Sequence, residues 1–173
     1  MRRTTGLLLC LILAVVACNK SAVTLTPAEQ LDSDINLIDE YLAANNINAI
    51  RLESGIRYII TENTDGAVAT KDNCIKFLYS GYELYDSVAF DYNNTTGLIL
   101  PLKSLVGGMQ IGMKLIPEGA KGTIYMPSIY GYGTDGSPDG AGGYIVNPNA
   151  CLRFDVELLH LFPYNAEANY CVQ

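Results

Sequence analysis

The sequence predicts an α+β domain in which an antiparallel sheet of about five strands is accompanied by a short internal helix and preceded by a longer N-terminal helix. Apolar residues make up 49% of the 173 residues and charged residues 17%, which is enough to build a core and excludes a chain that is disordered overall. Short runs of β-forming residues, separated by turn-rich segments, follow one another between residues 55 and 161. Two other stretches repeat apolar residues at the three- and four-residue spacing of a helix.

Residues 1–17 are predicted to be a lipoprotein signal peptide and not part of the fold. The chain starts with a short basic segment, and the apolar run that follows ends at Ala17, too short for a spanning helix of about 20 residues. Cys18 comes directly after this run and is followed by polar residues, an arrangement that resembles a bacterial lipobox. The resemblance implies that Cys18 is lipidated and that residues 18–25 form a tether to the bilayer. The alternative is an ordinary signal peptide followed by a chance cysteine.

Residues 26–54 are expected to form the N-terminal helix and a connector. Thr26 fits the N-cap, Pro27 the first helical position, and Glu29 completes a capping box. One apolar face follows, and Asn45 marks a plausible end; the face is formed by Leu31, Ile35, Ile38 and Leu42. This face could serve a dimerisation arm or pack on the helix's own domain. We favour the second interpretation, because a single helix of about 18 residues is short for a coiled-coil arm.

The remaining elements are short strands and one helix. Residues 104–115 have a helical rhythm, with Ser104 as a candidate N-cap, and residues 130–143 form a glycine-rich loop. The third strand begins at Phe90, is interrupted by a loop at 93–97 and resumes at 98–100. The other strands are expected at 57–60, 73–84, 123–126 and 151–161.

Charge and composition exclude several functions. The chain has 18 acidic and 11 basic residues, a net charge of -7 that disfavours nucleic-acid binding. Its one histidine, His160, rules out a multi-histidine metal site or a histidine relay. Residues 135–140 resemble the first half of an EF-hand loop, but Val146 stands at the twelfth position and cannot supply the carboxylate that calcium needs. We therefore expect no metal and no cofactor.

A combination of motifs carries a more specific signal. The segment 125–133 reads Tyr-Met-Pro-Ser-Ile-Tyr-Gly-Tyr-Gly, and the closing strand contains Phe-Asp-Val-Glu-Leu-Leu at 154–159. The segments 79–81, 90–91 and 106–109 precede them in order. Together these motifs resemble the FKBP-type peptidyl-prolyl isomerases, a family that also binds macrolides. The resemblance covers roughly residues 55–162, which would form the isomerase domain, with 163–173 as a C-terminal tail.

The resemblance implies a sheet curled around the short helix, with a peptide pocket between them. The Val106 amide and the Tyr132 hydroxyl would donate hydrogen bonds to substrate carbonyls, and Asp91 would lie at the polar edge. Catalysis would therefore rest on Tyr132, Asp91 and Val106. The substrate would contact the remaining pocket residues, which are Tyr79, Phe90, Met109, Ile145, Val146 and Phe154.

The implied reaction requires no nucleophile. Rotation about an X-Pro amide meets a barrier of about 18–20 kcal/mol, and its cis and trans forms are close in energy. The twisted amide is less dipolar than the planar one, so a dry aromatic pocket with fixed donors favours it. The resemblance therefore implies a peptidyl-prolyl cis-trans isomerase that acts on exported proteins and assists their folding.

Some positions depart from the family's pattern. Met109 stands where the family often has Trp, and residues 92–97 lack the basic residue that usually pairs with the aspartate. Thr96 and Leu98 occupy the positions of an aromatic pair. These departures predict weakened macrolide affinity. They leave two alternatives open: a catalytically weak peptide-binding or chaperone lipoprotein on the same fold, and a structural envelope lipoprotein whose pocket is only core.

The lipobox-like sequence predicts a location in the bacterial cell envelope, with the protein anchored through Cys18. The expected position is the outer membrane, on the side that faces the periplasm. In that oxidising compartment the three cysteines beyond Cys18 permit at most one internal bridge. In the family's sheet the second strand is antiparallel to the last, which would place Cys74 near His160. The tail could then return Cys171 to Cys74, so the resemblance implies a Cys74–Cys171 bridge and a free Cys151.

Overall fold

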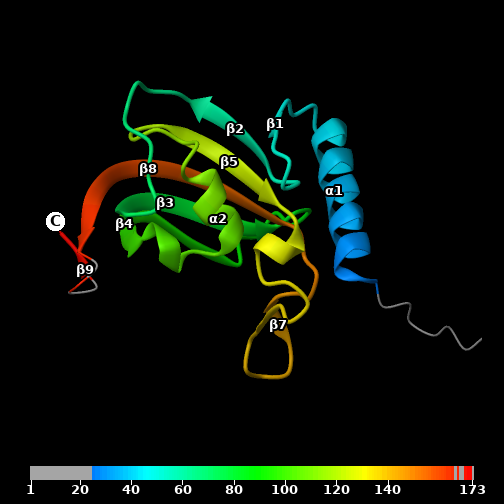
Figure 1. Ribbon diagram of the computed structural model, residues 1–173. Helices are drawn as coiled ribbons and strands as arrows, with labels where there is room; N and C mark the ends of the chain where they lie inside the picture. Colours follow the sequence, from blue (N-terminus) through cyan, green and yellow to red (C-terminus); the bar gives the residue numbers. More distant parts are fainter. Residues whose placement is uncertain (1–24, 166, 168–169, 173) are drawn as a thin grey trace, which may run out of the picture.

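The computed structural model describes residues 25–165, 167 and 170–172 (Figure 1). The predicted signal peptide, the lipidation site Cys18 and residues 18–24 of the tether lie outside the described residues. Within the described part of the chain, no helix is long and apolar enough to cross a membrane.

Helix α1 spans Pro27–Ala44 and begins as the sequence predicts. The Thr26 hydroxyl accepts a hydrogen bond from the Glu29 amide, and the Glu29 carboxylate accepts one from the Thr26 amide, which is a complete capping box. The helix ends at its C-cap, Asn45. Its buried side packs on the chain's own domain, with Ile38 and Leu42 in a cluster with Tyr125. This packing confirms the interpretation that the helix belongs to its own domain.

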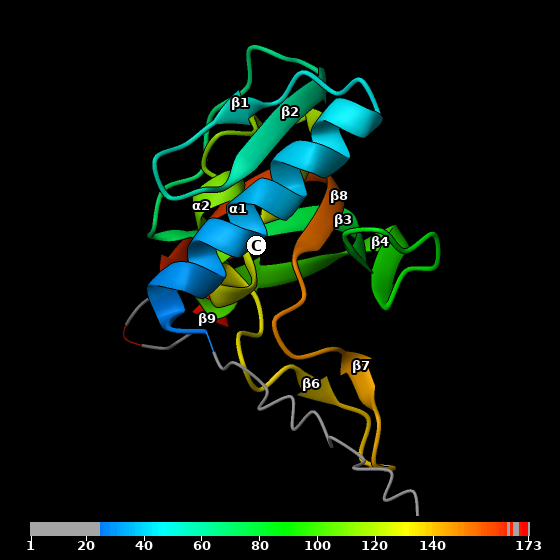
Figure 2. The ribbon, with the colours of Figure 1, turned by 90° about the vertical axis from the view of Figure 1, so that its right-hand side faces the viewer.

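A twisted antiparallel sheet forms the body of the domain (Figures 1 and 2). Its strand order is β1-β2-β5-β8-β3-β4, and β9 pairs with the end of β8. Five of these strands match the predicted ones, and the very short β1 and β9 are additions. The bounds are β1 Ile50–Arg51, β2 Arg57–Glu62, β3 Asn73–Glu83, β4 Asp91–Pro101, β5 Lys121–Met126, β8 Leu152–Asn165 and β9 Tyr170–Cys171.

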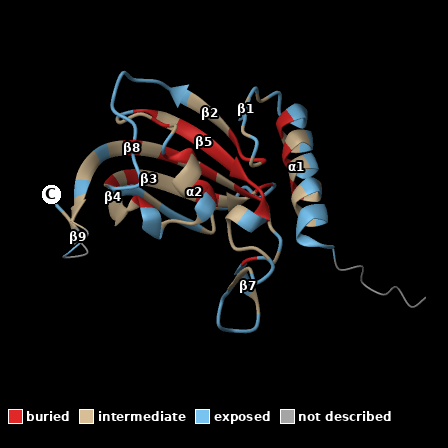
Figure 3. Cartoon of the chain, in the orientation of Figure 1, coloured by how far each residue is buried: buried red, intermediate tan, exposed pale blue. Residues whose placement is uncertain are grey.

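The two faces of the sheet bury different clusters. Along β5, Ile124 and Met126 face the main core while Tyr125 faces α1, as the two-residue period of a strand requires. The main core also contains Met109 and Met113 from the segment of helix α2, which spans Gly107–Gly112. Helices α1 and α2 therefore lie on opposite sides of the sheet, and Figure 3 shows buried residues on the side of α1 that faces it.

Strand β4 and the internal helix differ from the sequence prediction. Strand β4 is continuous, and the expected interruption at 93–97 is a register irregularity between the pairs Tyr79↔Asn93 and Phe77↔Leu98. The internal helix is shorter than 104–115, because a 3-10 turn, η1 Leu102–Ser104, precedes α2. Ser104 is therefore not its N-cap, which is Val106. The consecutive glycines that open α2 are weak helix formers, which fits so short a helix.

The glycine-rich loop and the last strand also differ in detail. The 3-10 turn η2, Ser128–Tyr130, overlaps the start of the loop, and a small hairpin pairs β6 Ser137–Pro138 with β7 Tyr144–Val146. The Asp139 carboxylate accepts hydrogen bonds from the Ala141 and Gly143 amides at the hairpin tip, and these bonds lower its pKa. The closing strand, expected to stop at 161, continues through β8 to Asn165.

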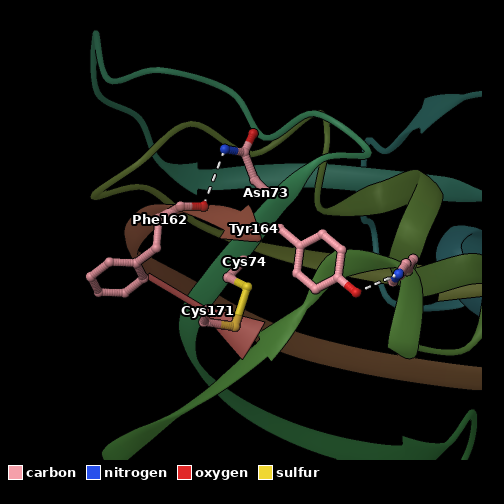
Figure 4. The surroundings of a disulfide bond; sticks show 6 residues. Asn73, Cys74, Phe162, Tyr164 and Cys171 are labelled. Atoms are coloured by element: carbon pink, nitrogen blue, oxygen red, sulfur yellow. Dashed lines mark hydrogen bonds between the residues drawn. A yellow bond between two sulfur atoms is a disulfide. The ribbon is translucent and has the colours of Figure 1, made fainter. Parts of the chain in front are cut away.

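A disulfide ties the C-terminal segment to the sheet (Figure 4). Cys74 lies opposite Phe162 in the β3–β8 register, and β9 returns along β8 through the pair Tyr164↔Cys171. Cys74 and Cys171 are bridged with their Cα atoms 5.6 Å apart. Cys151 is free and buried at the other end of β8. The bridge confirms the pairing implied by the family's strand order.

Candidate active site

A cavity of about 210 Å³ lies between the sheet and the segment that leads into α2. Strands β3, β4 and β8 supply one wall, and residues 104–109 with Tyr132 supply the other. Six of the residues singled out from the sequence line it, which are Tyr79, Asp91, Val106, Met109, Tyr132 and Phe154. These residues come from five separate segments, so only the folded sheet brings them together.

Aromatic rings form the apolar side of the site. Phe90 meets Phe154 edge-on with ring centroids 5.7 Å apart, and it meets Tyr132 edge-on at 6.2 Å. Tyr79 lies against Phe154 at 6.4 Å. Gly81 makes this packing achievable, because a Cβ there would fall 2.6 Å from a Phe154 ring carbon and 2.9 Å from one of Phe90. On this stretch of β3, Tyr79 supplies one ring of the site, and Gly81 leaves room for the rings of Phe90 and Phe154.

The polar edge of the site is built by Tyr79 and Asp91. The Tyr79 hydroxyl donates to Asp91 Oδ2 at 2.9 Å, across the β3–β4 pair. Burial, reinforced by the hydrogen bond to this carboxylate, raises the pKa of Tyr79 to about 12. Asp91 itself is exposed to solvent. Tyr79 therefore stays protonated at neutral pH and holds the carboxylate in place.

Two residues that line the cavity carry donors without a hydrogen-bond partner in the described part of the chain. Val106 is the N-cap of α2, and its carbonyl accepts from the Gln110 amide. Among the described residues, neither the Val106 amide nor the Tyr132 hydroxyl has a hydrogen-bond partner. Burial and the nearby Asp91 raise the pKa of Tyr132, which keeps its hydroxyl protonated. Both groups can donate to a carbonyl group that enters the cavity.

Met109 forms the base of the cavity and is only 2% exposed. Gly108 lets helix α2 pack close to the sheet, because there is no room for a Cβ between this position and Met126. This close packing keeps Met109 at the cavity. The cavity base is thus a flexible, polarisable thioether instead of an aromatic plane.

Three predicted substrate contacts do not line the cavity. Phe90 packs edge-on against the rings of Phe154 and Tyr132, which do line it. Ile145 is 50% exposed on β7 of the small hairpin, and Val146 is 1% exposed with its side chain in the main core. The register of the hairpin turns the two side chains to opposite sides. Val146 was predicted to line the pocket, but in this structure its side chain is buried in the main core and is not part of the cavity lining.

The prediction also missed several lining residues, which are Phe77, Leu98, Leu100, Ser104 and Leu105. Phe77 and Tyr79 are two residues apart on β3, and Leu98 and Leu100 have the same spacing on β4, so the two-residue period was a usable signal. Nothing in the sequence could show that η1 brings Ser104 and Leu105 to the cavity.

A larger hollow of about 470 Å³ lies near the start of α1, lined by residues such as Leu25, Ile129 and Asn149. None of the predicted site residues lines it. We assign the site to the smaller cavity, because the aromatic rings and the unpartnered donors converge there.

Comparison with known proteins identifies the family of the chain. The pattern of the family described as FKBP-type peptidyl-prolyl cis-trans isomerase matches residues 66–159. The chain therefore belongs to the FKBP-type peptidyl-prolyl cis-trans isomerase family.

Individual relatives extend the match beyond the family pattern. The chain is 36% identical over 123 residues to a probable FKBP-type peptidyl-prolyl cis-trans isomerase FkpA of Neisseria meningitidis, covering 69% of this chain and 43% of that protein. It is 35% identical over 125 residues to FkpA of Aeromonas hydrophila, covering 70% and 44%. The chain thus spans less than half the length of these two relatives.

Solved structures share the fold. A peptidyl-prolyl cis-trans isomerase from Pseudomonas syringae superposes with a TM-score of 0.63 at 22% identity, covering 80% of this chain and 98% of that one. FkpA from Escherichia coli gives 0.64 at 24% identity, covering 79% and 62%.

Proposed function

We propose that this protein is a peptidyl-prolyl cis-trans isomerase that acts on X-Pro bonds of exported polypeptides and assists their folding. One observation carries the proposal: an aromatic cavity lined by two residues whose donors have no partner among the described residues, the Val106 amide and the Tyr132 hydroxyl. Membership of the family supports it.

The geometry suits rotation about an amide. A proline ring would lie over Met109 among the rings of Tyr79 and Phe154, where it would displace water from the apolar side of the cavity. In this environment the twisted amide, which is less dipolar, loses less solvation than the planar one. Val106 and Tyr132 would hold neighbouring carbonyls, so that only the X-Pro bond is free to turn. Asp91, fixed by Tyr79, would lie at the edge where the chain enters.

A protease-free isomerisation assay on a proline-containing tetrapeptide tests the proposal, with residues 19–173 as the enzyme. We expect exchange between cis and trans to accelerate in proportion to protein concentration. An exchange rate equal to that of the uncatalysed peptide would refute the isomerase assignment.

A second candidate is a catalytically weak peptide-binding or chaperone lipoprotein on the same fold. It is favoured by Met109 at the cavity base and by the partner of Asp91, which is Tyr79 and not a basic side chain. Titration of the tetrapeptide by NMR separates the two candidates. Shifts at cavity residues without acceleration of exchange would support the second. A macrolide titrated in the same way is expected to bind weakly, because the flat platform under its ring system is missing.

The same proposal includes a location in the bacterial cell envelope, with a lipid anchor at Cys18 and an outer-membrane, periplasm-facing position. Two features support it: the lipobox-like end of the apolar run, and the Cys74–Cys171 bridge, since disulfides persist in oxidising compartments.

Fractionation of cells that express wild type or Cys18→Ser tests the anchor. Wild type is expected with the membranes, and Cys18→Ser is expected to be released or to remain unprocessed, because a lipobox cysteine carries the acyl chains. Equal partitioning of both proteins would remove the lipoprotein assignment.

A further inference from the structure

Asp34 is a fully buried carboxylate on the face of α1 that packs on the domain. It is 0% exposed and lies four residues before Ile38 and eight before Leu42, so it occupies the same apolar stripe. Burial of a carboxylate is costly unless hydrogen bonds compensate it. This residue lies outside the segment 66–159 that matches the family. Its burial therefore calls for a role of its own.

The hydrogen bonds of Asp34 lead out of the helix to the turn after β5. Its Oδ2 accepts from the Ser128 amide at 2.8 Å and from the Ser128 hydroxyl at 2.6 Å, while Oδ1 accepts from Gln30 Nε2 at 2.7 Å. Ser128 is itself 1% exposed. Charge-assisted hydrogen bonds in a dry environment are stronger than neutral ones, so this contact fixes the start of η2 on α1.

Ser128 in turn holds the residues on both sides of Tyr132. Its carbonyl accepts from the Gly131 amide and from the Gly133 amide, each at 2.9 Å. The Gly133 carbonyl then accepts from the Asn149 amide at 2.8 Å. Gly133 has a φ of +58°, a conformation that glycine adopts readily and L side chains rarely adopt, so a glycine suits this position of the turn. A continuous chain of hydrogen bonds therefore runs from Asp34 to the backbone that carries the Tyr132 side chain.

We propose that Asp34 is a positioning residue of the isomerase site, which makes the N-terminal helix part of the catalytic unit. Asp34 does not touch the cavity; it fixes Ser128, and Ser128 fixes the turn that aims the Tyr132 hydroxyl. The expected effect of Asp34 on the isomerisation rate rests on the proposed function. Its effect on the conformation of the turn that carries Tyr132 does not depend on that function.

The kinetic test compares Asp34→Ala, Asp34→Asn and a matched control on the same helix. Asp39→Asn is the control, since Asp39 pairs with Arg57 at 3.0 Å and with Arg51 at 3.1 Å but does not contact Ser128. At a temperature where all variants are folded, Asp34→Ala is expected to lower kcat/KM about fivefold, the scale of one hydrogen bond lost in the transition state. Asp34→Asn keeps one acceptor and should recover part of this loss. Asp39→Asn should stay within about twofold of wild type.

A double-mutant cycle distinguishes positioning from general stability. In a Tyr132→Phe background there is no hydroxyl to aim, so Asp34→Ala should cost less than about twofold further. If the two losses multiply, or if Asp39→Asn is as slow as Asp34→Ala, Asp34 only anchors the helix and the inference is wrong. Should Asp34→Ala fail to fold, Ser128→Ala removes one donor to the same carboxylate and replaces it in the cycle.

Amide hydrogen exchange tests the turn independently of activity. The Gly131 and Gly133 amides should exchange faster in Asp34→Ala than in wild type, and their rates should be unchanged in Asp39→Asn. Unchanged exchange in Asp34→Ala would overturn the inference even if the protein is an isomerase. If wild type shows no isomerase activity, the proposed function fails, and the exchange rates alone then decide whether Asp34 holds the turn.

Discussion

The hydroxyl of Tyr132 is the single group whose removal tests the site with the least change in shape. Tyr132→Phe hardly alters volume and removes a donor that has no partner among the described residues, so the unfolding free energy should hardly change. Loss of the hydrogen bond that the hydroxyl would donate to a substrate carbonyl costs about 0.5–1.5 kcal/mol. The same loss in the transition state would lower kcat/KM roughly three- to tenfold. The assay is cis-trans exchange of the tetrapeptide. Tyr92, which is 64% exposed and outside the cavity, supplies the control Tyr92→Phe. Unfolding, or activity equal to that of the control, would show that Tyr132 is a core residue.

Tyr79 gives a prediction about pH. Burial and the hydrogen bond to Asp91 raise the pKa of Tyr79 to about 12 from the ordinary 10.0. Because the folded-state pKa is the higher one, the stabilisation is fully present below about pH 10 and is lost as the pH rises through about 12. Phenolate absorbance is titrated in wild type and in Tyr79→Phe, and the difference between the two curves reports Tyr79. This difference should show deprotonation near pH 12. A difference curve centred near pH 10 would contradict the buried, hydrogen-bonded position of this hydroxyl.

At the scale of the element, strand β3 owes its shape at the site to one small residue. Gly81→Ala would place a Cβ 2.6 Å from the Phe154 ring and 2.9 Å from the Phe90 ring, so both rings must shift. We expect a loss of about 1–3 kcal/mol in unfolding free energy, as for other overpacked sites, together with weaker peptide binding. Urea unfolding and NMR titration measure the two effects.

Gly107→Ala is the matched control for this change. A Cβ at Gly107, the first residue of α2, would meet its nearest neighbour at 3.6 Å, which is ordinary contact. Its stability should equal or slightly exceed that of wild type, because Ala is the better helix former. If Gly81→Ala is as stable as Gly107→Ala, the rings do not pack as tightly as described.

At the scale of the whole molecule, the Cys74–Cys171 bridge joins residues 97 positions apart. A cross-link over so long a segment restricts the unfolded chain, so Cys171→Ser should lower the unfolding free energy by about 2–4 kcal/mol. Adding a reductant should destabilise wild type to a similar extent and leave Cys171→Ser unchanged. Peptide mapping of the oxidised protein that finds Cys151 in a bridge would contradict the strand order around β8.

The sequence determined on its own those features that depend on neighbours along the chain. The capping box at Thr26 and the apolar rhythm of α1 define a helix from local hydrogen bonds and side-chain spacing. The alternation in the closing strand likewise specifies which residues face the core. The motifs around Tyr79, Asp91, Val106 and Tyr132 identified residues that the fold brings to one cavity.

Only the tertiary structure decided which side chains reach that cavity and what supports them. Ser104 and Leu105 line it, while Val146 turns into the core, because the course of the chain and the direction of the hairpin are set by pairing between distant segments. Asp34 lies on the apolar stripe of α1, and a carboxylate can be buried there because Ser128, 94 residues away, supplies donors to it. Local patterns specify elements, whereas the environment of a polar group depends on partners that the chain brings together only on folding.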